Sequence, residues 1–330
     1  MFMEQARGRI RGKGMRVVFP EGLEPRTLQA AALLHAQDLV RSVLLGPVGE
    51  IRARLHSLGI DTEAVDIRDP MHDPQTASYA ATYEDLRRHK GISTADSVAK
   101  VRLSHYFGAL MVNAGDAAGM VSGLNSETKP FIPAFEVIRM REGFHRVSSV
   151  FIMEWPQRVL FYADCSVNIA PDAATLSEIA CATAQTVCSF GIEPRVAFLS
   201  FSTRDSARHD SVDRVKEAVL LTRAAAPDLI VDGELQFDAA FLPDIARKKS
   251  PDSPFANEGA NVFIFPDLNA GNIAYKITER LGGASAIGPI LQGLNRPVND
   301  VSRGCSAQDL ADVAVITAVL ACGEQVQPTG

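Results

Sequence analysis

The chain has 330 residues, of which 46% are hydrophobic and 22% are charged, so it can bury one large core or two moderate ones. We expect two domains. A formal net charge of -6 and a pI near 5.7 argue against the basic face of a nucleic-acid-binding protein. The five cysteines form no CxxC pair and the seven histidines show no HExxH-like spacing, so neither a disulfide framework nor a metal site is expected.

Hydropathy also argues against a membrane protein. No apolar run approaches the roughly 18 residues of a membrane span. The basic N-terminus has no apolar stretch of signal-peptide length before the first expected strand. We therefore expect a cytoplasmic protein that acts on small molecules and has neither a nucleic-acid nor a membrane partner.

The first part of the chain alternates strand and helix patterns. Short apolar runs at 16–20, 40–45 and 64–67 have the composition of buried strands, and apolar-periodic helix patterns at 26–37 and 48–58 separate them. This alternation predicts a parallel sheet covered by helices, with functional loops at the carboxyl ends of the strands.

A candidate anion-binding loop follows in the middle of the chain. A buried strand is expected at 119–122 and a polar loop at 123–133. Ser126, Thr128 and Lys129 in this loop are suitable donors for a phosphate, although an ordinary polar loop has the same composition.

Helical patterns surround this loop. They lie at 81–90, 98–114 and 135–142. Around Gly143 we expect the chain to cross into a second domain.

The second half repeats the alternation of strands and helices. Strands are expected at 148–153, 159–163, 195–201, 229–232 and 261–265, and helices at 174–190, at 212–226 and from residue 266. Ser202 and Thr203 follow one strand in a loop whose hydroxyls, arginines and amide hydrogens can hold a phosphate. No GxGxxG or GxxxxGK motif is present, so neither a dinucleotide fingerprint nor a P-loop is supported. Glu234 and Asp238 are spaced for one helix face, but we favour structural roles for both.

The stretch 288–309 is rich in Gly, Pro, Asn and Asp and is typical of an ordered functional loop. Near its end, Ser306 has the position of a helix N-cap, with Asp309 in the first turn. Arg303 beside Ser302 combines a fixed fork of donors with a hydroxyl, a pair that suits an anion. The alternative is that Asp309 only interacts with the helix dipole and Ser302 only caps a turn.

Five segments carry a family resemblance: LRRHKG (86–91), LSFSTRDSARH (199–209), VDGELQFDAAF (231–241), FPDLNAGNIAYKITERLGG (265–283) and GPILQGLNRPVNDVSRGCSAQD (288–309). They resemble the phosphate acetyltransferases, which move an acetyl group between coenzyme A and orthophosphate. The similarity therefore spans nearly the whole chain. Acetate metabolism is the pathway expected by default. Ethanolamine utilisation is an alternative, because ADCSV and SARH also resemble the ethanolamine-utilisation type of this family.

The resemblance implies an α/β fold of two doubly wound three-layer domains, with the active site in the interdomain cleft. The first domain would comprise residues 1–142 and 304–330, and the second domain residues 143–303. A homodimer is expected by analogy with the family.

Roles for individual residues are also implied by the resemblance. Asp309 is expected to be the general base toward the coenzyme A thiol and to be partly desolvated, because an exposed aspartate is too weak a base. Arg303 would hold the phosphoryl group and Ser302 would donate to the same centre. Arg87 and Arg280 would bind substrate phosphates, although Arg87 alone also suits a helix C-terminus. The other expected substrate-binding residues are Ser126, Thr128, Lys129, Ser202, Thr203 and Asn269.

Two positions depart from the family pattern. Ile132 stands where the family has an arginine before a Pro-Ala pair, and Asp205 stands where it usually has a glycine. Our hypothesis is that Lys129 replaces the missing arginine as a point charge, and the alternative is an ordinary solvated lysine. Because glycine and aspartate differ in backbone preference and charge, the family pattern does not predict the backbone conformation of this loop or its affinity for an anion.

No metal or cofactor is expected, because a thioester and an acyl phosphate exchange by attack at one carbonyl and coenzyme A is itself a substrate. We favour direct transfer in a ternary complex over an acyl-enzyme on Ser302 or Cys305, which have no histidine near them in the sequence. The alternative functions are a phosphate butyryl or propanoyl transferase and a non-catalytic acetyl-CoA sensor.

Overall fold

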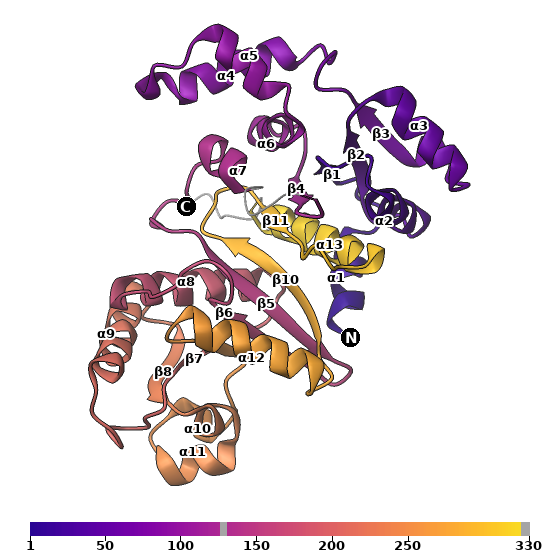
Figure 1. Ribbon diagram of the computed structural model, residues 1–330. Coiled ribbons are helices and arrows are strands. Elements are labelled where there is room, and N and C mark those ends of the chain that lie inside the picture. The colour runs from indigo at the N-terminus through magenta and orange to yellow at the C-terminus, as the bar shows by residue number, and fades with distance from the viewer. Residues whose placement is uncertain (126–130, 325–330) are drawn as a thin grey trace. The chain divides into compact units, whose positions relative to one another are not determined.

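The computed structural model describes residues 1–125 and 131–324 (Figure 1). Contacts divide the chain into two compact units, each with its own sheet. The first unit comprises Met3–Arg141 and Leu294–Gly330, and the second comprises Met1–Phe2 and Glu142–Gly293. Both sheets are rich in parallel strands and have helices packed against them, which confirms the predicted α/β class.

The sheet of the first unit has five parallel strands in the order β11-β4-β1-β2-β3. They are β1 (Arg16–Phe19), β2 (Arg41–Leu45), β3 (Val65–Arg68), β4 (Gly119–Ser122) and β11 (Val298–Asp300). From β1 the chain builds outward to β3 and then returns to the other side of β1 with β4. Doubly wound sheets bind ligands where the strand order reverses in this way, so the carboxyl ends of β1 and β4 mark the expected site.

The helices of this unit cover its sheet. They are α1 (Phe2–Ile10), α2 (Pro25–Ala36), α3 (Val48–Ser57), η1 (Thr62–Ala64), α4 (Thr76–Leu86), η2 (Arg88–Lys90), α5 (Thr94–Val101), α6 (Ser104–Ala114), α7 (Phe131–Val137) and α13 (Ala307–Glu324). Helices α2 and α13 lie side by side, and α13 also contacts β1, β4 and β11 (Figure 1). Pro25 favours a helix start at this point because its fixed φ suits the first helical position.

The second unit has six strands in the order β10-β5-β6-β9-β7-β8. Strand β5 pairs antiparallel with β6 and β10, whereas the remaining pairs are parallel. The strands are β5 (Ser148–Trp155), β6 (Arg158–Ala163), β7 (Arg195–Leu199), β8 (Ile230–Leu235), β9 (Val262–Ile264) and β10 (Ser285–Gln292). The helices are α8 (Ala173–Ser189), α9 (Asp210–Ala225), α10 (Phe237–Phe241), α11 (Pro243–Lys249), η3 (Pro254–Ala256) and α12 (Leu268–Arg280).

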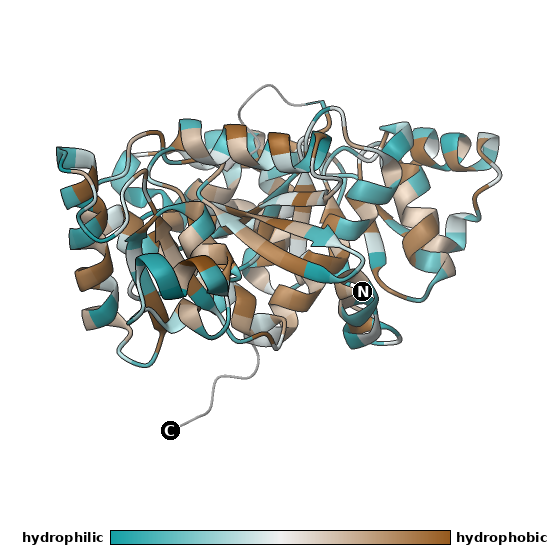
Figure 2. Ribbon diagram, turned by 90° about the horizontal axis from the view of Figure 1, so that it is seen from below, coloured by the Kyte–Doolittle hydropathy of each residue, from teal (hydrophilic) through white to brown (hydrophobic). Residues whose placement is uncertain are grey.

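Burial follows the sequence pattern in both units. Strand β1 is buried along most of its length, β4 is buried throughout, and Phe151, Tyr162 and Phe263 belong to the core of the second unit. Figure 2 shows strands coloured mainly brown and helices that alternate brown and teal, as expected where one helix face is buried.

Several elements differ from those expected. The stretch 288–309 is not one loop, because it contains the end of β10 and all of β11. The single helix expected at 98–114 is two helices, α5 and α6, which separate at Leu103 because that residue has an extended backbone. Residues 294–303 were expected in the second domain but group with the first unit, where β11 pairs with β4.

Helix α1 was also not expected from the sequence. Over the two described ranges, no helix has both the length and the apolar composition needed to cross a bilayer.

Candidate active site

The side chain of Glu21, two residues after β1, connects the carboxyl ends of β1 and β4. Its Oε2 accepts the N–H groups of Gly123 and Leu124 at 2.9 Å each, and its Oε1 accepts that of Asn125 at 2.7 Å. Bonds from three successive amides to a carboxylate fix the backbone where the β4–α7 loop begins. Gly123 has a φ of +117°, and a Cβ there would lie 1.9 Å from Asp300 Oδ1, so this position requires glycine.

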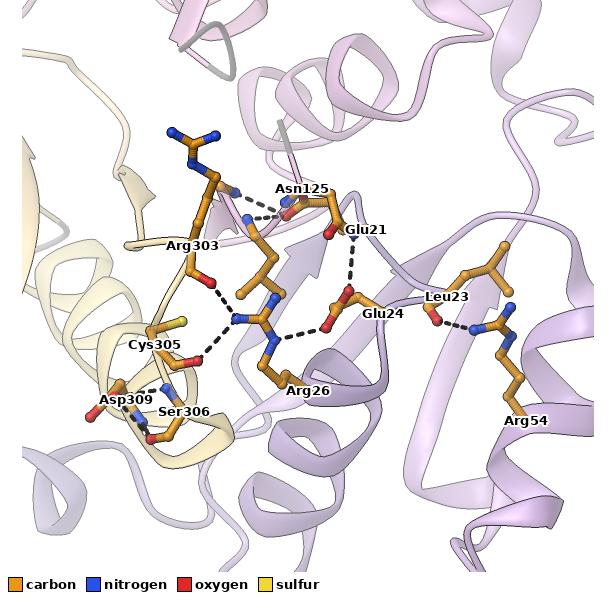
Figure 3. Close-up of polar contacts among 12 residues, drawn as sticks. Glu21, Leu23, Glu24, Arg26, Arg54, Asn125, Arg303, Cys305, Ser306 and Asp309 are labelled. Atoms are coloured by element: carbon orange, nitrogen blue, oxygen red, sulfur yellow. Dashed lines mark hydrogen bonds and ion pairs between the residues drawn. The ribbon is translucent and has the colours of Figure 1, made fainter. Parts of the chain in front are cut away.

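A chain of polar contacts joins this loop to the loop between β11 and α13 (Figure 3). Asn125 Nδ2 donates to Glu24 Oε2 at 3.1 Å, and Glu24 Oε1 accepts from Arg26 Nε at 2.7 Å. Arg26 Nη1 donates to the main-chain carbonyls of Arg303 at 2.7 Å and Cys305 at 3.1 Å. We refer to these bonds together as the Arg26 bridge. Through it, side chains at the start of α2 contact both loops beside the reversal of strand order.

Ser306 and Asp309 cap the start of α13, as the sequence predicted. Ser306 Oγ accepts the Asp309 N–H at 3.1 Å, and Asp309 Oδ2 accepts the N–H and the hydroxyl of Ser306 at 2.8 and 2.9 Å. Asp309 is exposed in this structure. The partial desolvation expected of a general base is therefore not found here.

Ser302 and Arg303 are exposed on the same loop. The Arg303 guanidinium has no hydrogen bond or ion pair to any residue in the described parts of the chain, and it points away from Arg26 (Figure 3). Ser302 Oγ accepts a long bond from the Gly304 N–H, at 3.3 Å. The charged fork and the hydroxyl are thus both open to an anion, as the sequence pattern indicated.

Cys305 is half-buried between these residues and Arg26. Burial raises the pKa of its thiol to about 11, although the positive charge of Arg26 opposes the rise. The thiolate, which is the nucleophilic form of cysteine, is therefore scarce at neutral pH.

Two buried polar atoms near Glu21 have no hydrogen-bond partner among the described residues. They are Asp300 Oδ1, at the end of β11, and His105 Nε2, on α6. Burial raises the pKa of Asp300 to about 7; a bond from the Val301 N–H opposes this rise, and the charge of Glu21 adds to it. Burial lowers the pKa of His105, against the opposite effect of Glu21. Below pH 7 the Asp300 carboxyl is therefore mostly neutral.

Arg87 lies at the C-terminal end of α4, in the same unit as Arg303. Its Nη2 is 3.4 Å from Glu136 Oε1, a long contact. Glu136 Oε2 also accepts the hydroxyls of Tyr83 at 2.7 Å and Tyr106 at 2.9 Å. Because this contact is long, the Arg87 guanidinium can still bind a phosphate. Phosphate binding by Arg87 stays a prediction.

In the second unit, Ser202 and Thr203 are buried and hold their own loop. Ser202 Oγ donates to Glu234 Oε1 at 3.0 Å, and Thr203 Oγ1 accepts the Gln236 N–H at 2.9 Å. Both contacts tie the loop after β7 to β8 and its C-terminal end. In this structure these hydroxyls have a structural role and do not face solvent.

Asp205 has a φ of 63°, the left-handed backbone that glycine usually adopts. Its N–H donates to Glu234 Oε1 at 2.8 Å, and its carboxylate is paired with Lys216 Nζ at 2.5 Å. The loop therefore keeps a glycine-like conformation with an aspartate, which tolerates this region better than most side chains.

The remaining predicted residues are spread over both units. Asn269 and Arg280 lie on exposed positions at the two ends of α12, where Arg280 Nε is 3.3 Å from Glu279. Asp238 is paired with Lys249 at 2.8 Å, which fits the structural role favoured for it. Ser126, Thr128 and Lys129 lie outside the described residues, and Ile132 is exposed on α7.

The family of this chain follows from comparison with known proteins. A family model described as "Phosphate acetyl/butaryl transferase" matches residues 1–318. The chain belongs to this family. A phosphate acetyltransferase of Bacillus subtilis (strain 168) is 44% identical over 315 residues, which are 95% of this chain and 97% of that protein. The predicted resemblance is thereby confirmed.

Solved structures of the family have the same fold. The EutD phosphotransacetylase from Staphylococcus aureus aligns with a TM-score of 0.92 at 39% identity, over 97% of this chain and 98% of that chain. A phosphotransacetylase from Streptococcus pyogenes aligns with the same TM-score of 0.92 at 43% identity and with the same coverage, 97% and 98%.

Sequence reasoning missed Glu21, Glu24 and Arg26. These residues belong to FPEGLEPR, which follows the first strand of an alternating β/α pattern. The loop after a first parallel strand borders the reversal of strand order in doubly wound sheets, and that position was the available signal.

Proposed function

We propose that this protein is a phosphate acetyltransferase, which transfers an acetyl group reversibly between coenzyme A and orthophosphate. The observation that carries the proposal is the pair of Ser302 and Arg303 beside the carboxyl ends of β4 and β11, with a guanidinium that has no partner among the described residues. An open arginine fork suits a phosphoryl group. The relatives named phosphate acetyltransferase and phosphotransacetylase support the same activity.

In the direction of acetyl-CoA synthesis, Asp309 accepts the thiol proton, and the thiolate attacks the carbonyl carbon of acetyl phosphate. The bond from that carbon to the phosphate oxygen then breaks and phosphate leaves. Arg303 holds the phosphoryl group and offsets charge on the carbonyl oxygen, and Ser302 donates to the same centre. The thiol has an ordinary pKa of about 8.5, so Asp309 needs bound coenzyme A to shield it from water before it can act as the base. Arg87 and Arg280 are proposed to bind substrate phosphates.

Direct transfer in a ternary complex is favoured over an acyl-enzyme. The raised pKa of Cys305 leaves little thiolate to attack, and no histidine in the described ranges is hydrogen-bonded to Ser302 or Cys305. Ping-pong kinetics together with a trapped acyl-enzyme would overturn this order of events.

The experiment is an assay of coenzyme A-dependent consumption of acetyl phosphate by the purified protein, with thioester formation followed at the same time. Equal loss of acetyl phosphate and gain of thioester is the expected result. Binding of acetyl-CoA without turnover would instead identify a sensor. We propose that no metal or cofactor takes part, so exhaustive chelation and dialysis should leave the rate unchanged.

A phosphate butyryl transferase is the second candidate, because the matching family model covers both acyl groups. The same assay with acetyl, propanoyl and butyryl phosphates separates the candidates. A higher kcat/KM for the acetyl compound is expected, and a preference for butyryl would replace the first proposal with the second.

We also propose that the protein is a cytoplasmic homodimer that associates through α12. Ile273, Ile277 and Leu281 recur every four residues and are 57%, 52% and 85% exposed. Beside them lies a cavity of about 390 Å³ whose lining includes Trp155 and Phe241. A contiguous apolar surface of this kind marks an interaction site more often than a solvated face. Sedimentation should show a dimer that Leu281→Asp converts to a monomer, and a wild-type monomer would contradict the proposal.

A further inference from the structure

We propose that Arg26 is a positioning residue, which sets the main chain of the Ser302–Ser306 segment so that the Arg303 side chain faces the substrate, and that Glu24 couples this segment to the β4–α7 loop. This role rests on the proposed acetyl transfer. Arg26 itself is not required to touch a substrate.

The bonds of Arg26 are placed to control Arg303. Its Nη1 binds the carbonyl oxygens of Arg303 and Cys305, on either side of Gly304. When both carbonyls are turned toward Arg26, the Arg303 side chain leaves the main chain on the opposite side, as Figure 3 shows. A single guanidinium thus selects the side on which the second guanidinium is presented.

The segment has little else to hold it. Among the described residues, its other polar contacts before the α13 cap are the Cys305 N–H bond to Ser302 O at 2.9 Å and the long Gly304 N–H bond to Ser302 Oγ at 3.3 Å. Both lie within the segment and do not attach it to the sheet. The bonds from Arg26 attach the segment to the start of α2, which directly follows the β1–α2 loop.

Glu24 holds the Arg26 side chain in place. Its two oxygens separately accept Arg26 Nε at 2.7 Å and Asn125 Nδ2 at 3.1 Å. Burial tends to raise the pKa of Glu24, but the hydrogen bonds from Arg26 and Asn125 prevail and lower it. The carboxylate is therefore charged at neutral pH, and its bond with Arg26 is charge-assisted, which strengthens it. Because Asn125 is also fixed by Glu21, the two loops share one support.

The chain offers a matched control in Arg54. Its Nη1 donates to the carbonyl oxygen of Leu23 at 2.8 Å, so it too binds the main chain of a loop at the same edge of the sheet (Figure 3). Leu23 belongs to the β1–α2 loop and not to the segment that carries Arg303. Loss of the Arg54 bond removes a similar contact without releasing Arg303.

The test compares Arg26→Gln and Arg54→Gln. Arg26→Gln should lower kcat by about tenfold to 100-fold, because a reacting group that is misplaced by about 1 Å costs that much, while KM changes less than about threefold. Arg54→Gln should leave kcat unchanged and should unfold within about 4 °C of Arg26→Gln. Added guanidinium ion should restore part of the kcat lost in Arg26→Ala, because it can refill the vacated space and bind the same two carbonyls.

Hydrogen exchange on the substrate-free protein provides a readout that does not depend on activity. Arg26→Gln should speed exchange at Gly304 and Cys305, and Arg54→Gln should not. Equal exchange in both variants would overturn the proposal, and so would a raised KM with an unchanged kcat, which would make Arg26 a substrate ligand. If exchange responds as expected but the wild type transfers no acetyl group, the function is wrong and the positioning stands.

Discussion

Ser306 and Asp309 bind each other through three hydrogen bonds, and both bonds that Asp309 accepts fall on the same oxygen, Oδ2. Oδ1 has no bond to another described residue. Capping of α13 and acceptance of a proton can therefore use different oxygens of one carboxylate. The two roles considered for Asp309 from the sequence are compatible with each other.

Asp309→Asn should separate these roles. Asparagine keeps an acceptor for the cap but cannot take a proton, so kcat should fall on the order of 100-fold with KM little changed. Stability should change by less than about 1 kcal/mol. Raising the pH should restore part of the rate by supplying thiolate.

Ser306→Ala is the control for the cap. It should cost about 1 kcal/mol of unfolding free energy and leave kcat within a few-fold. If Asp309→Asn behaves like Ser306→Ala in both measurements, Asp309 is only a cap.

Asp300 should make the protein less stable as the pH rises. The pKa of its carboxyl is about 7 in the folded protein against 3.8 for the free side chain, so between these values the folded state binds more protons than the unfolded state. Stability then falls with increasing pH over this window and levels off above it. Asp300→Asn should remove a fall on the order of 3 to 4 kcal/mol between about pH 4 and about pH 7.

Urea unfolding at several pH values checks this prediction. The wild type and Asp300→Asn should differ in slope only below about pH 7. Parallel profiles would show that Asp300 is ionised throughout the window and that its buried oxygen has a partner in solution.

Gly123→Ala should be far more costly than Gly115→Ala. Both glycines have positive φ, +117° and +82°, but the added Cβ meets Asp300 Oδ1 at 1.9 Å only at Gly123, and at Gly115 nothing lies within 4 Å. Backbone strain alone costs about 1 kcal/mol, and the clash should add roughly 2 kcal/mol or more. Chemical denaturation of the two variants measures the difference, and equal losses would contradict the close packing of Gly123 on Asp300.

The sequence predicted elements well where local periodicity defined them. Strand β4 was predicted at its observed bounds, and α2, β2 and α8 were predicted to within one residue at each end. Strand β11 was missed because two of its three residues, Asn299 and Asp300, are polar, and because the strand is defined by its pairing with β4. The misplacement of residues 294–303 followed from the same omission.

Only part of the candidate site could be predicted from the sequence, because only that part is formed by residues close together in the chain. Ser302, Arg303 and the Ser306–Asp309 cap lie within eight consecutive residues, so turn chemistry and family resemblance were enough to find them. The Glu21 contact with Gly123 joins residues 102 apart, and that of Arg26 with Arg303 joins residues 277 apart. Such contacts depend on the strand order, so the sequence indicates which loop borders the reversal but not which residues pair across it.

The most direct test of the account is the turnover number of Arg303→Ala for acetyl transfer, measured beside Arg52→Ala, which removes an exposed arginine on α3. Arg303→Ala should lower kcat by a factor on the order of 100 or more, because a charged donor aimed at developing charge acts mainly in the transition state. Arg52→Ala should match the wild type, and circular dichroism should show both variants folded. Near-normal turnover in a folded Arg303→Ala would contradict the assignment of this loop as the catalytic centre.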